Sequence, residues 1–207
     1  MTLGLAFLCL TFLCLFYFFM TPWILVLFLL SGILAGFSAI FFRDPIRRID
    51  AVPDNILSPA DGKVLKVMEM NDGYVGPGAH QVSIFMSPLD VHVNRSPVSG
   101  SVERVEYHPG CFLGAFRDKA SLLNEQVHIG IAGTRGKILV KLIAGFLARR
   151  IVWDVKEGGF LLIGQKMAFI RLGSRADLVL PAGVSIRVKA GDRVKAGITV
   201  LAHFPGS

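Results

Sequence analysis

The sequence predicts a mainly β domain of the α+β class that follows N-terminal transmembrane helices. Residues 3–42 contain no charged side chain, although the 207-residue chain holds 22 Lys+Arg and 15 Asp+Glu. After residue 42 come short runs rich in β-branched and aromatic residues, bounded by Gly, Pro, Asn or Asp, with no long stretch of helical periodicity. We therefore expect a membrane anchor at residues 1–42 and one compact, mainly antiparallel domain at residues 43–207.

The anchor contains two apolar segments, residues 3–20 and 23–42, each close to the roughly 20 residues that cross a bilayer. Thr21-Pro22 lies between them, where proline can begin or interrupt a helix. We expect two transmembrane helices joined by a tight turn. One long kinked or tilted span is the alternative, because the connection is short for a helical hairpin.

Charge and cysteine content indicate where the domain lies. Arg43, Arg47 and Arg48 follow the second segment and no basic residue precedes it, so the positive-inside rule predicts a domain on the cytoplasmic side of the cell (inner) membrane. Cys111 is the only cysteine of the domain, which excludes an internal disulfide and suits a reducing compartment. The net charge of +7 belongs to the domain and favours anionic lipid as a partner. Nucleic acid is disfavoured, because no basic run is interleaved with aromatic residues.

Short strands fill the domain. The predicted strands are Val64–Met68, Gln81–Met86, Val102–Tyr107, Val127–Ala132, Ile138–Ile143, Met167–Leu172, Val184–Val188 and Thr199–Ala202, with Ala115–Leu123 and Gly145–Ile151 as short helices or loops. The tail 183-GVSIRVKAGDRVKAGITVLA-202 resembles the barrel-sandwich hybrid arrangement of lipoyl and biotinyl carrier domains. A carrier role is disfavoured, because no lysine display motif occupies a hairpin midpoint.

Three stretches could carry chemistry: 58-SPADGKV-64, 88-PLDVHVNRSPVSG-100 and 172-LGSRADLVLP-181. Taken singly, each has an ordinary structural explanation. Asp61 before a glycine is typical of a turn. Asp90 and His92 alternate, so we expect them on one face of a strand. Gly173 lies between two strand-like runs, Met167–Leu172 and Leu178–Leu180, and a glycine in such a place indicates a bulge or a close backbone approach.

In this order, the three stretches resemble the phosphatidylserine decarboxylases of the short bacterial and archaeal type. Further similar stretches are 119-KASLLNEQ-126, 142-LIAGFLARRI-151 and 191-GDRVKAGITVLA-202, so the resemblance covers essentially all of residues 43–207. The resemblance implies a membrane enzyme of phospholipid biosynthesis that converts phosphatidylserine to phosphatidylethanolamine. It also implies a covalent pyruvoyl group as cofactor, with no metal and no diffusible cofactor.

The resemblance further implies that the chain cuts itself at 173/174. Ser174 would attack the carbonyl of Gly173, and elimination would separate chains 1–173 and 174–207, leaving Ser174 as the pyruvoyl residue. His92 is the candidate base and Asp61 its orienting or proton-managing partner. The product would be a heterodimer of the two chains, with a higher oligomer left open.

One position departs from the longer members of the family. They carry a second histidine three positions after the first, and this chain has Arg95 there. Arg95 could hold the carboxylate or phosphate of the substrate, as could Arg149, Arg150 and Arg175, because guanidinium suits oxyanions. A basic surface near lipid is the alternative for these arginines.

Two rival functions remain on sequence grounds. A membrane-anchored, non-catalytic hybrid-barrel adaptor predicts an intact bond at 173/174. A zinc hydrolase could use Asp90 and histidines 80, 92, 108, 128 and 203. The sequence lacks His-x-His and His-Glu-x-x-His pairs, so it predicts no metal site.

Overall fold

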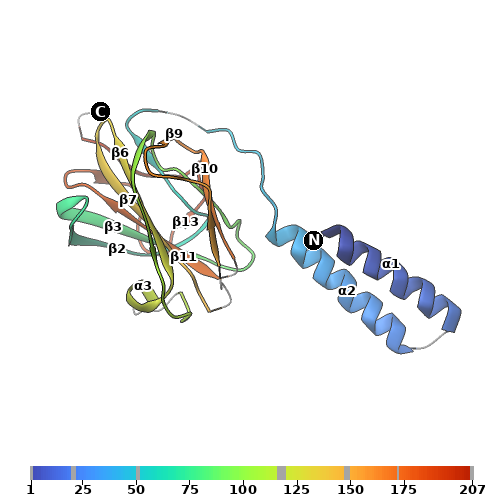
Figure 1. The fold of residues 1–207 in the computed structure, drawn as a ribbon. Helices are drawn as coiled ribbons and strands as arrows, with labels where there is room; N and C mark the ends of the chain where they lie inside the picture. The colour runs from blue at the N-terminus through green and yellow to red at the C-terminus, as the bar shows by residue number, and fades with distance from the viewer. Residues whose placement is uncertain are drawn as a thin grey trace. The chain divides into compact units, whose positions relative to one another are not determined.

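The computed structural model describes residues 2–19, 22–49, 52–115, 120–146, 150–171 and 173–205. The chain divides into two compact units, Met1–Asp44 and Pro45–Ser207 (Figure 1). Each unit is described by itself.

The first unit is a pair of helices, α1 (Thr2–Phe19) and α2 (Pro22–Phe41), as the sequence predicted. They pack against each other, with Cys9 Sγ 2.9 Å from Ser31 Oγ. Most of their large apolar side chains are exposed, as expected of surfaces that face lipid. Helix α2 is long and apolar enough to cross a membrane, whereas the apolar helical stretch described in α1, Leu3–Leu15, is shorter.

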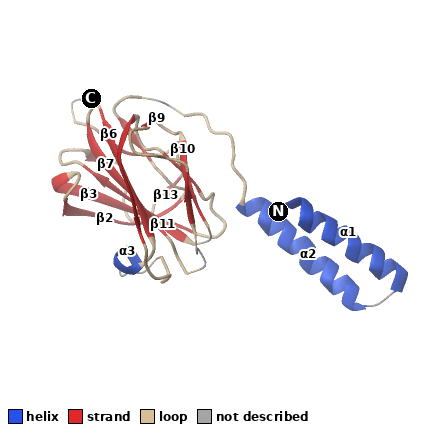
Figure 2. Ribbon diagram, viewed as in Figure 1, coloured by secondary structure: helices blue, strands red, loops and turns tan. Residues whose placement is uncertain are grey.

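The second unit is a β domain in which every strand pairing is antiparallel (Figure 2), so the predicted mainly β class is confirmed. One sheet has the order β13-β2-β3-β11-β7-β6-β5-β9, and two smaller sheets have the orders β1-β14-β12 and β4-β10-β8. The elements are β1 (Asn55–Leu57), β2 (Gly62–Asp72), β3 (Gly76–Met86), β4 (Val93–Arg95), β5 (Gly100–His108), α3 (Ala120–Leu123), β6 (Gln126–Gly133), β7 (Gly136–Ile143), β8 (Ile151–Trp153), β9 (Phe160–Leu161), β10 (Lys166–Ile170), β11 (Ser174–Leu180), β12 (Ser185–Ile186), β13 (Arg193–Val194) and β14 (Val200–His203).

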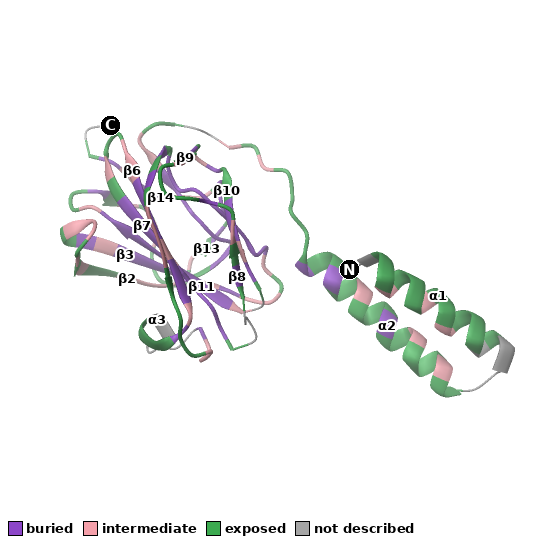
Figure 3. Cartoon of the chain, in the orientation of Figure 1, coloured by how far each residue is buried: buried purple, intermediate pink, exposed green. Residues whose placement is uncertain are grey.

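The large sheet buries an apolar face. Ile84, Ile129, Val140 and Leu178 are fully buried in the main core, which they reach from four neighbouring strands. Because side chains alternate along a strand, the residues that precede and follow each of these four along its own strand point to the other face of the sheet. Strand β11 is buried along its whole length (Figure 3), since β3 and β7 flank it on both sides.

One sequence expectation, the position of Asp90 and His92, needs correction. Asp90 and His92 do not lie on a strand: they belong to the turn and loop between β3 and β4, so strand alternation does not determine where they point. Of the segment Ala115–Leu123, residues 120–123 form the short helix α3, and residues 116–119 lie outside the described part of the chain.

Candidate active site

The site begins at a turn whose backbone conformation favours glycine. Gly173, just before β11, has φ +68°, a left-handed conformation that side chains disfavour. A Cβ atom added to Gly145 would overlap the carbonyl oxygen of Gly173. The two backbones therefore meet at the carbonyl group that precedes Ser174. This is the close backbone approach that the glycine in the strand-like run predicted.

Ser174 is the first residue of β11 and is fully buried. It lies opposite Met86, the last residue of β3, and its Oγ is 3.4 Å from the Met86 Sδ. A thioether is a weak hydrogen-bond acceptor, so this contact stabilises the hydroxyl only slightly. The serine is thus shielded from water while its hydroxyl stays available for reaction.

The same methionine connects Ser174 to the other two motifs. The Asn94 side chain donates from Nδ2 to Met86 Sδ at 3.7 Å and to the carbonyl of Pro59 at 3.4 Å. The Arg95 backbone N–H also donates to Pro59, at 2.9 Å. Residues from all three motifs therefore meet around one buried point, although they are far apart in the chain.

His92 is fully buried in the loop just before β4, which pairs with β10. Its carbonyl accepts a bond of 3.3 Å from the N–H of Ile170, and its ring lies 6.5 Å from that of Phe169. The ring Nδ1 lies 2.9 Å from the carbonyl oxygen of Asp90. A carbonyl can only accept, so Nδ1 carries the proton and Nε2 of the neutral ring has the basic lone pair.

Asp61 is held by a residue that precedes the domain's strands. Its carboxylate pairs with both terminal nitrogens of Arg47, at 2.6 and 2.8 Å, and accepts a bond of 2.8 Å from the N–H of Ala196. The Arg47 side chain is 5% exposed, so this is a buried, bidentate pair. The Asp61 side chain is therefore held in a fixed position just before β2.

The four candidate arginines differ in environment. Arg95 is buried and donates to the carbonyl of Gly164 at 3.1 Å. Arg175 is 1% exposed and bonds Asp177 at 2.6 and 2.9 Å and Ser83 at 2.9 Å, so its guanidinium is already satisfied by the protein. That arrangement gives Arg175 a structural role, and its role in substrate binding stays a prediction.

Of the other two candidates, only Arg150 lies in the described part of the chain. Arg150 is exposed, and its carbonyl accepts a bond of 3.4 Å from the N–H of Arg171, which is also exposed. Arg149 lies outside the described residues. Arg150 and Arg171 therefore place two exposed cations beside the segment that leads into Ser174.

An apolar surface lies at the same edge of the large sheet. Strand β3 ends, β11 begins, β7 ends and β6 begins at this edge, as their pairings require. The loops here expose Leu89, Leu122, Leu123 and Phe146. Asn124 ties two of these loops together by bonding the backbone of Leu113 and the carbonyl of Ala144. Apolar side chains thus surround the strand end that carries Ser174.

A cavity of about 240 Å³ lies over the small sheet β4-β10-β8, lined by Val93, Trp153, Lys166 and Phe169 among others. This cavity lies on β4, which follows His92 in the chain, and on β10, whose Ile170 donates to the His92 carbonyl. A larger cavity of about 310 Å³ has Gly100, Ser101, Ala132 and Arg135 in its lining, at the opposite ends of β5 and β6. We assign the smaller cavity to the site because it shares Phe169 with His92.

Four site residues escaped prediction from the sequence. Asn94 lies inside the motif 88-PLDVHVNRSPVSG-100, so the sequence could have indicated it as a site residue. Met86 ends a predicted strand, but only the pairing with β11 shows what it touches. Gly145 and Arg47 gave no local signal, because their contacts depend on tertiary structure.

Comparisons with known proteins agree with these motifs. The family model described as phosphatidylserine decarboxylase matches residues 34–202. The chain is 45% identical over 174 residues to the phosphatidylserine decarboxylase proenzyme of Chlorobium limicola, covering 84% of this chain and 82% of that protein. It is 43% identical over 176 residues to the proenzyme of Prosthecochloris aestuarii, covering 85% and 81% of the two chains. A proenzyme of Salinibacter ruber is 45% identical over 174 residues, covering 82% and 77%.

Proposed function

Because this chain belongs to the phosphatidylserine decarboxylase family, we propose that it converts phosphatidylserine to phosphatidylethanolamine with a pyruvoyl group made from its own Ser174. One observation carries the proposal. The carbonyl of Gly173 and the hydroxyl of Ser174 adjoin at a left-handed glycine turn that Gly145 packs against. The relatives' description as proenzymes supports processing of the chain.

Self-cleavage begins with attack of Ser174 Oγ on the carbonyl carbon of Gly173. The peptide C–N bond breaks as the ester C–O bond forms, and the freed nitrogen takes up the hydroxyl proton. Loss of the Ser174 α-proton then expels the Gly173 carboxylate, which ends chain 1–173. Water converts the remaining dehydroalanine to a pyruvoyl group and releases ammonia. The glycine helps because no side chain hinders the approach to its carbonyl.

His92 is the proposed base. Its Nδ1 proton is held by the carbonyl of Asp90, which directs the basic Nε2 away from that loop. We propose Asp61 as the orienting or proton-managing partner of His92, with Arg47 holding the Asp61 carboxylate in place. Arg95 occupies the second-histidine position and is proposed to neutralise negative charge there.

The site's residues fit a pyruvoyl group at position 174. That position is fully buried against Met86, and a small planar group attached to the start of β11 needs little more room than serine. When present, the carbonyl of such a group serves as an electron sink for decarboxylation. Arg150 and Arg171 are proposed to bind the phosphate of the head group.

The substrate is a lipid, and the domain has a surface suited to one. Leu89, Leu122, Leu123 and Phe146 are exposed around the strand end that carries Ser174. We propose that these side chains enter the bilayer interface while nearby cations contact anionic head groups. The helix α2 and the three arginines at 43, 47 and 48 support attachment to the cytoplasmic side of the cell membrane.

The deciding experiment is the intact mass of the denatured protein, compared with Ser174→Ala and with Ser185→Ala. Ser185 is an exposed strand residue outside the site, so its variant controls for loss of a hydroxyl. We expect wild type and Ser185→Ala to give two species split at 173/174, the smaller one blocked at its N-terminus by a carbonyl. Ser174→Ala should stay intact and inactive on phosphatidylserine vesicles.

The rival adaptor function makes the opposite prediction. A single unmodified chain in membrane-extracted wild-type protein, with no phosphatidylethanolamine formed, would overturn the decarboxylase proposal. Cleavage without decarboxylation would support the pyruvoyl group and contradict only the proposal that phosphatidylserine is the substrate.

A further inference from the structure

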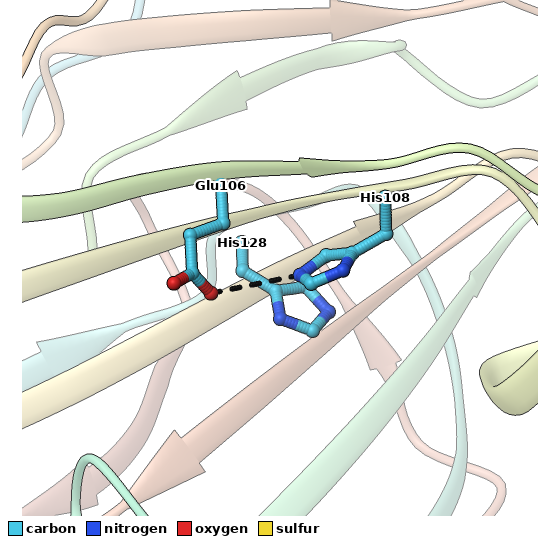
Figure 4. Close-up of side chains that lie close together, drawn as sticks. All are labelled: Glu106, His108 and His128. Carbon is cyan, nitrogen blue, oxygen red and sulfur yellow. Dashed lines mark ion pairs between the residues drawn. The ribbon is translucent and has the colours of Figure 1, made fainter.

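Three metal-binding side chains gather on the large sheet at a place that the proposed reaction does not use. Glu106 and His108 lie two residues apart on β5, and His128 lies on β6 directly opposite Glu106. Their ligand atoms all lie within 4.8 Å of one another. Figure 4 shows the carboxylate and the two rings facing one another from the paired strands. The rings of His108 and His128 are 4.3 Å apart between centroids.

This cluster is separate from the proposed active site. His128 alternates along β6 with Val127 and Ile129, which are buried in the main core. Its side chain therefore points to the other face of the sheet. Met86, the partner of Ser174, belongs to the core face. The cluster and Ser174 thus lie on opposite faces.

Neighbouring groups already orient two of the three ligands. Gln126 Oε1 lies 3.0 Å from His128 Nε2, and an amide oxygen can only accept, so Nε2 carries the proton and Nδ1 is left to coordinate. Arg104 Nε holds Glu106 Oε1 at 2.7 Å, and Glu106 Oε2 faces His108 at 3.6 Å. Outer contacts of this kind fix ligand orientation in metal sites.

The ligands also have room to move. Zinc ligands at about 2.0–2.1 Å from the metal lie roughly 3.3 Å apart in a tetrahedron. The Glu106 and His108 side chains are 37% and 47% exposed, so they have room to close the remaining gap.

We propose that Glu106, His108 and His128 bind a divalent transition metal, with zinc as the best match. Two imidazoles and one carboxylate suit zinc, nickel or copper, and do not suit the oxygen-only preference of calcium or magnesium. The bound ion would join β5 to β6 and stabilise the sheet. A fourth position would be filled by water. The reaction at Ser174 does not depend on it.

The test is a titration of the full-length protein with zinc against a chromophoric competing chelator. All samples carry Cys111→Ser, because the exposed Cys111 thiol could itself bind zinc. The variants are His108→Ala, His128→Ala and Glu106→Gln. His80→Ala is the matched control, because it removes an imidazole from β3 of the same sheet, outside the cluster.

We expect one zinc ion per chain in the parent and in His80→Ala. Loss of an outer-shell partner alone lowers metal affinity about 10–100-fold, so removal of either histidine should lower it by at least that factor. Zinc should also raise the midpoint of thermal unfolding of the parent and of His80→Ala, but not of His108→Ala. His108 is half exposed, so its alanine variant tests the site even if His128→Ala does not fold. Equal zinc affinity in parent and His108→Ala, or no saturable binding by the parent, would overturn the proposal.

Discussion

Gly145 makes a sharp prediction at the scale of one residue. Its backbone packs against the Gly173 carbonyl so closely that a Cβ atom would overlap it. Gly145→Ala should therefore displace the scissile carbonyl and slow self-cleavage more than about tenfold, the order of effect expected from a misplacement of about 1 Å. Gly73→Ala is the control, because a Cβ there meets no atom within 4 Å. Fragment formation on denaturing gels measures both. Equal cleavage in the two variants would contradict the role of the Gly145 contact.

His92 carries the second residue-scale prediction. If its Nε2 accepts the proton from Ser174, His92→Ala should remain almost entirely uncut, because general-base catalysis contributes about 10²–10⁴-fold. His203→Ala, which removes a half-buried histidine of β14, should cleave as wild type. The measurement is the rate of precursor loss in freshly synthesised protein. A His92→Ala precursor that cleaves at the normal rate would remove His92 from the mechanism.

His128 predicts how stability depends on pH. Its pKa is lowered from 6.5 to about 4 by burial and by His108, Lys141 and Arg104, with Asp72 opposing. Between these values the unfolded chain binds a proton that the folded protein does not, so stability is present above pH 6.5 and is lost as the pH falls toward 4. Because the ring is partly exposed, we reduce the expected loss to about 1–2 kcal/mol.

Urea unfolding of metal-free protein at pH 7 and at pH 4.5 measures this loss. His128→Gln should show a smaller decrease than wild type across the window, since glutamine does not titrate. An equally large decrease in both proteins would assign the pH dependence to other groups.

The residue scale is where sequence reasoning was least complete. Ser174 and His92 were predicted as site residues because the motifs around them resemble a family. Arg175 was one candidate for substrate binding because guanidinium suits oxyanions, and only the structure reveals its bonds to Asp177 and Ser83. The closeness of His108 and His128 depends on the register of β5 and β6, which no local pattern specifies.

At the scale of elements, the Arg47–Asp61 pair joins the segment before β1 to the start of β2. Arg47 also bonds the carbonyl of Ala196, so three parts of the chain meet there. Arg47→Ala would leave a buried carboxylate without its countercharge, and we expect it to lower the free energy of unfolding by about 3–5 kcal/mol.

A double variant separates the pair from its surroundings. Arg47→Met with Asp61→Asn removes both charges and should recover part of the stability lost in Arg47→Ala, because no lone charge remains. Denaturant unfolding of the wild type, Arg47→Met, Asp61→Asn and the double variant forms a complete cycle. A double variant less stable than either single variant would show that the charge pair itself is strongly stabilising.

Element existence followed well from sequence, and element ends followed less well. The two helices arise from a run without charged residues. In a lipid environment the backbone N–H and C=O groups of such a run must bond to one another, which a helix allows. Most strands were found from β-branched runs, yet β11 begins at Ser174, four residues before the predicted strand at Leu178. The start of β11 was missed because Ser174 and Arg175 are polar. Their side chains can be buried in a strand only because other parts of the fold provide their hydrogen-bond partners. The extension of β2 to Asp72 was missed because its outer residues are exposed and polar.

At the scale of the whole molecule, the proposed cut would fall inside the sheet. After cleavage, β11 of the short chain would remain between β3 and β7 of the long chain. Strands β13 and β14 of the short chain likewise pair with β2 and β1. We therefore expect the two chains to copurify in native buffer and at high salt, and to separate only in denaturant.

Size-exclusion chromatography with intact-mass detection checks this expectation. Separated chains, mixed after removal of denaturant, should not regain activity, because the short chain cannot enter a sheet whose central place has closed. Release of residues 174–207 in native buffer would contradict the interleaved arrangement.

The left-handed turn at Gly173 also sets the order of events in the life of the protein. Gly145 and Met86 reach the scissile bond only after β3, β7 and β11 have aligned. A chain that has not folded has no geometry for the cut and acquires no catalytic group. Only a chain that has folded correctly would therefore mature, so every active molecule would be a correctly folded one.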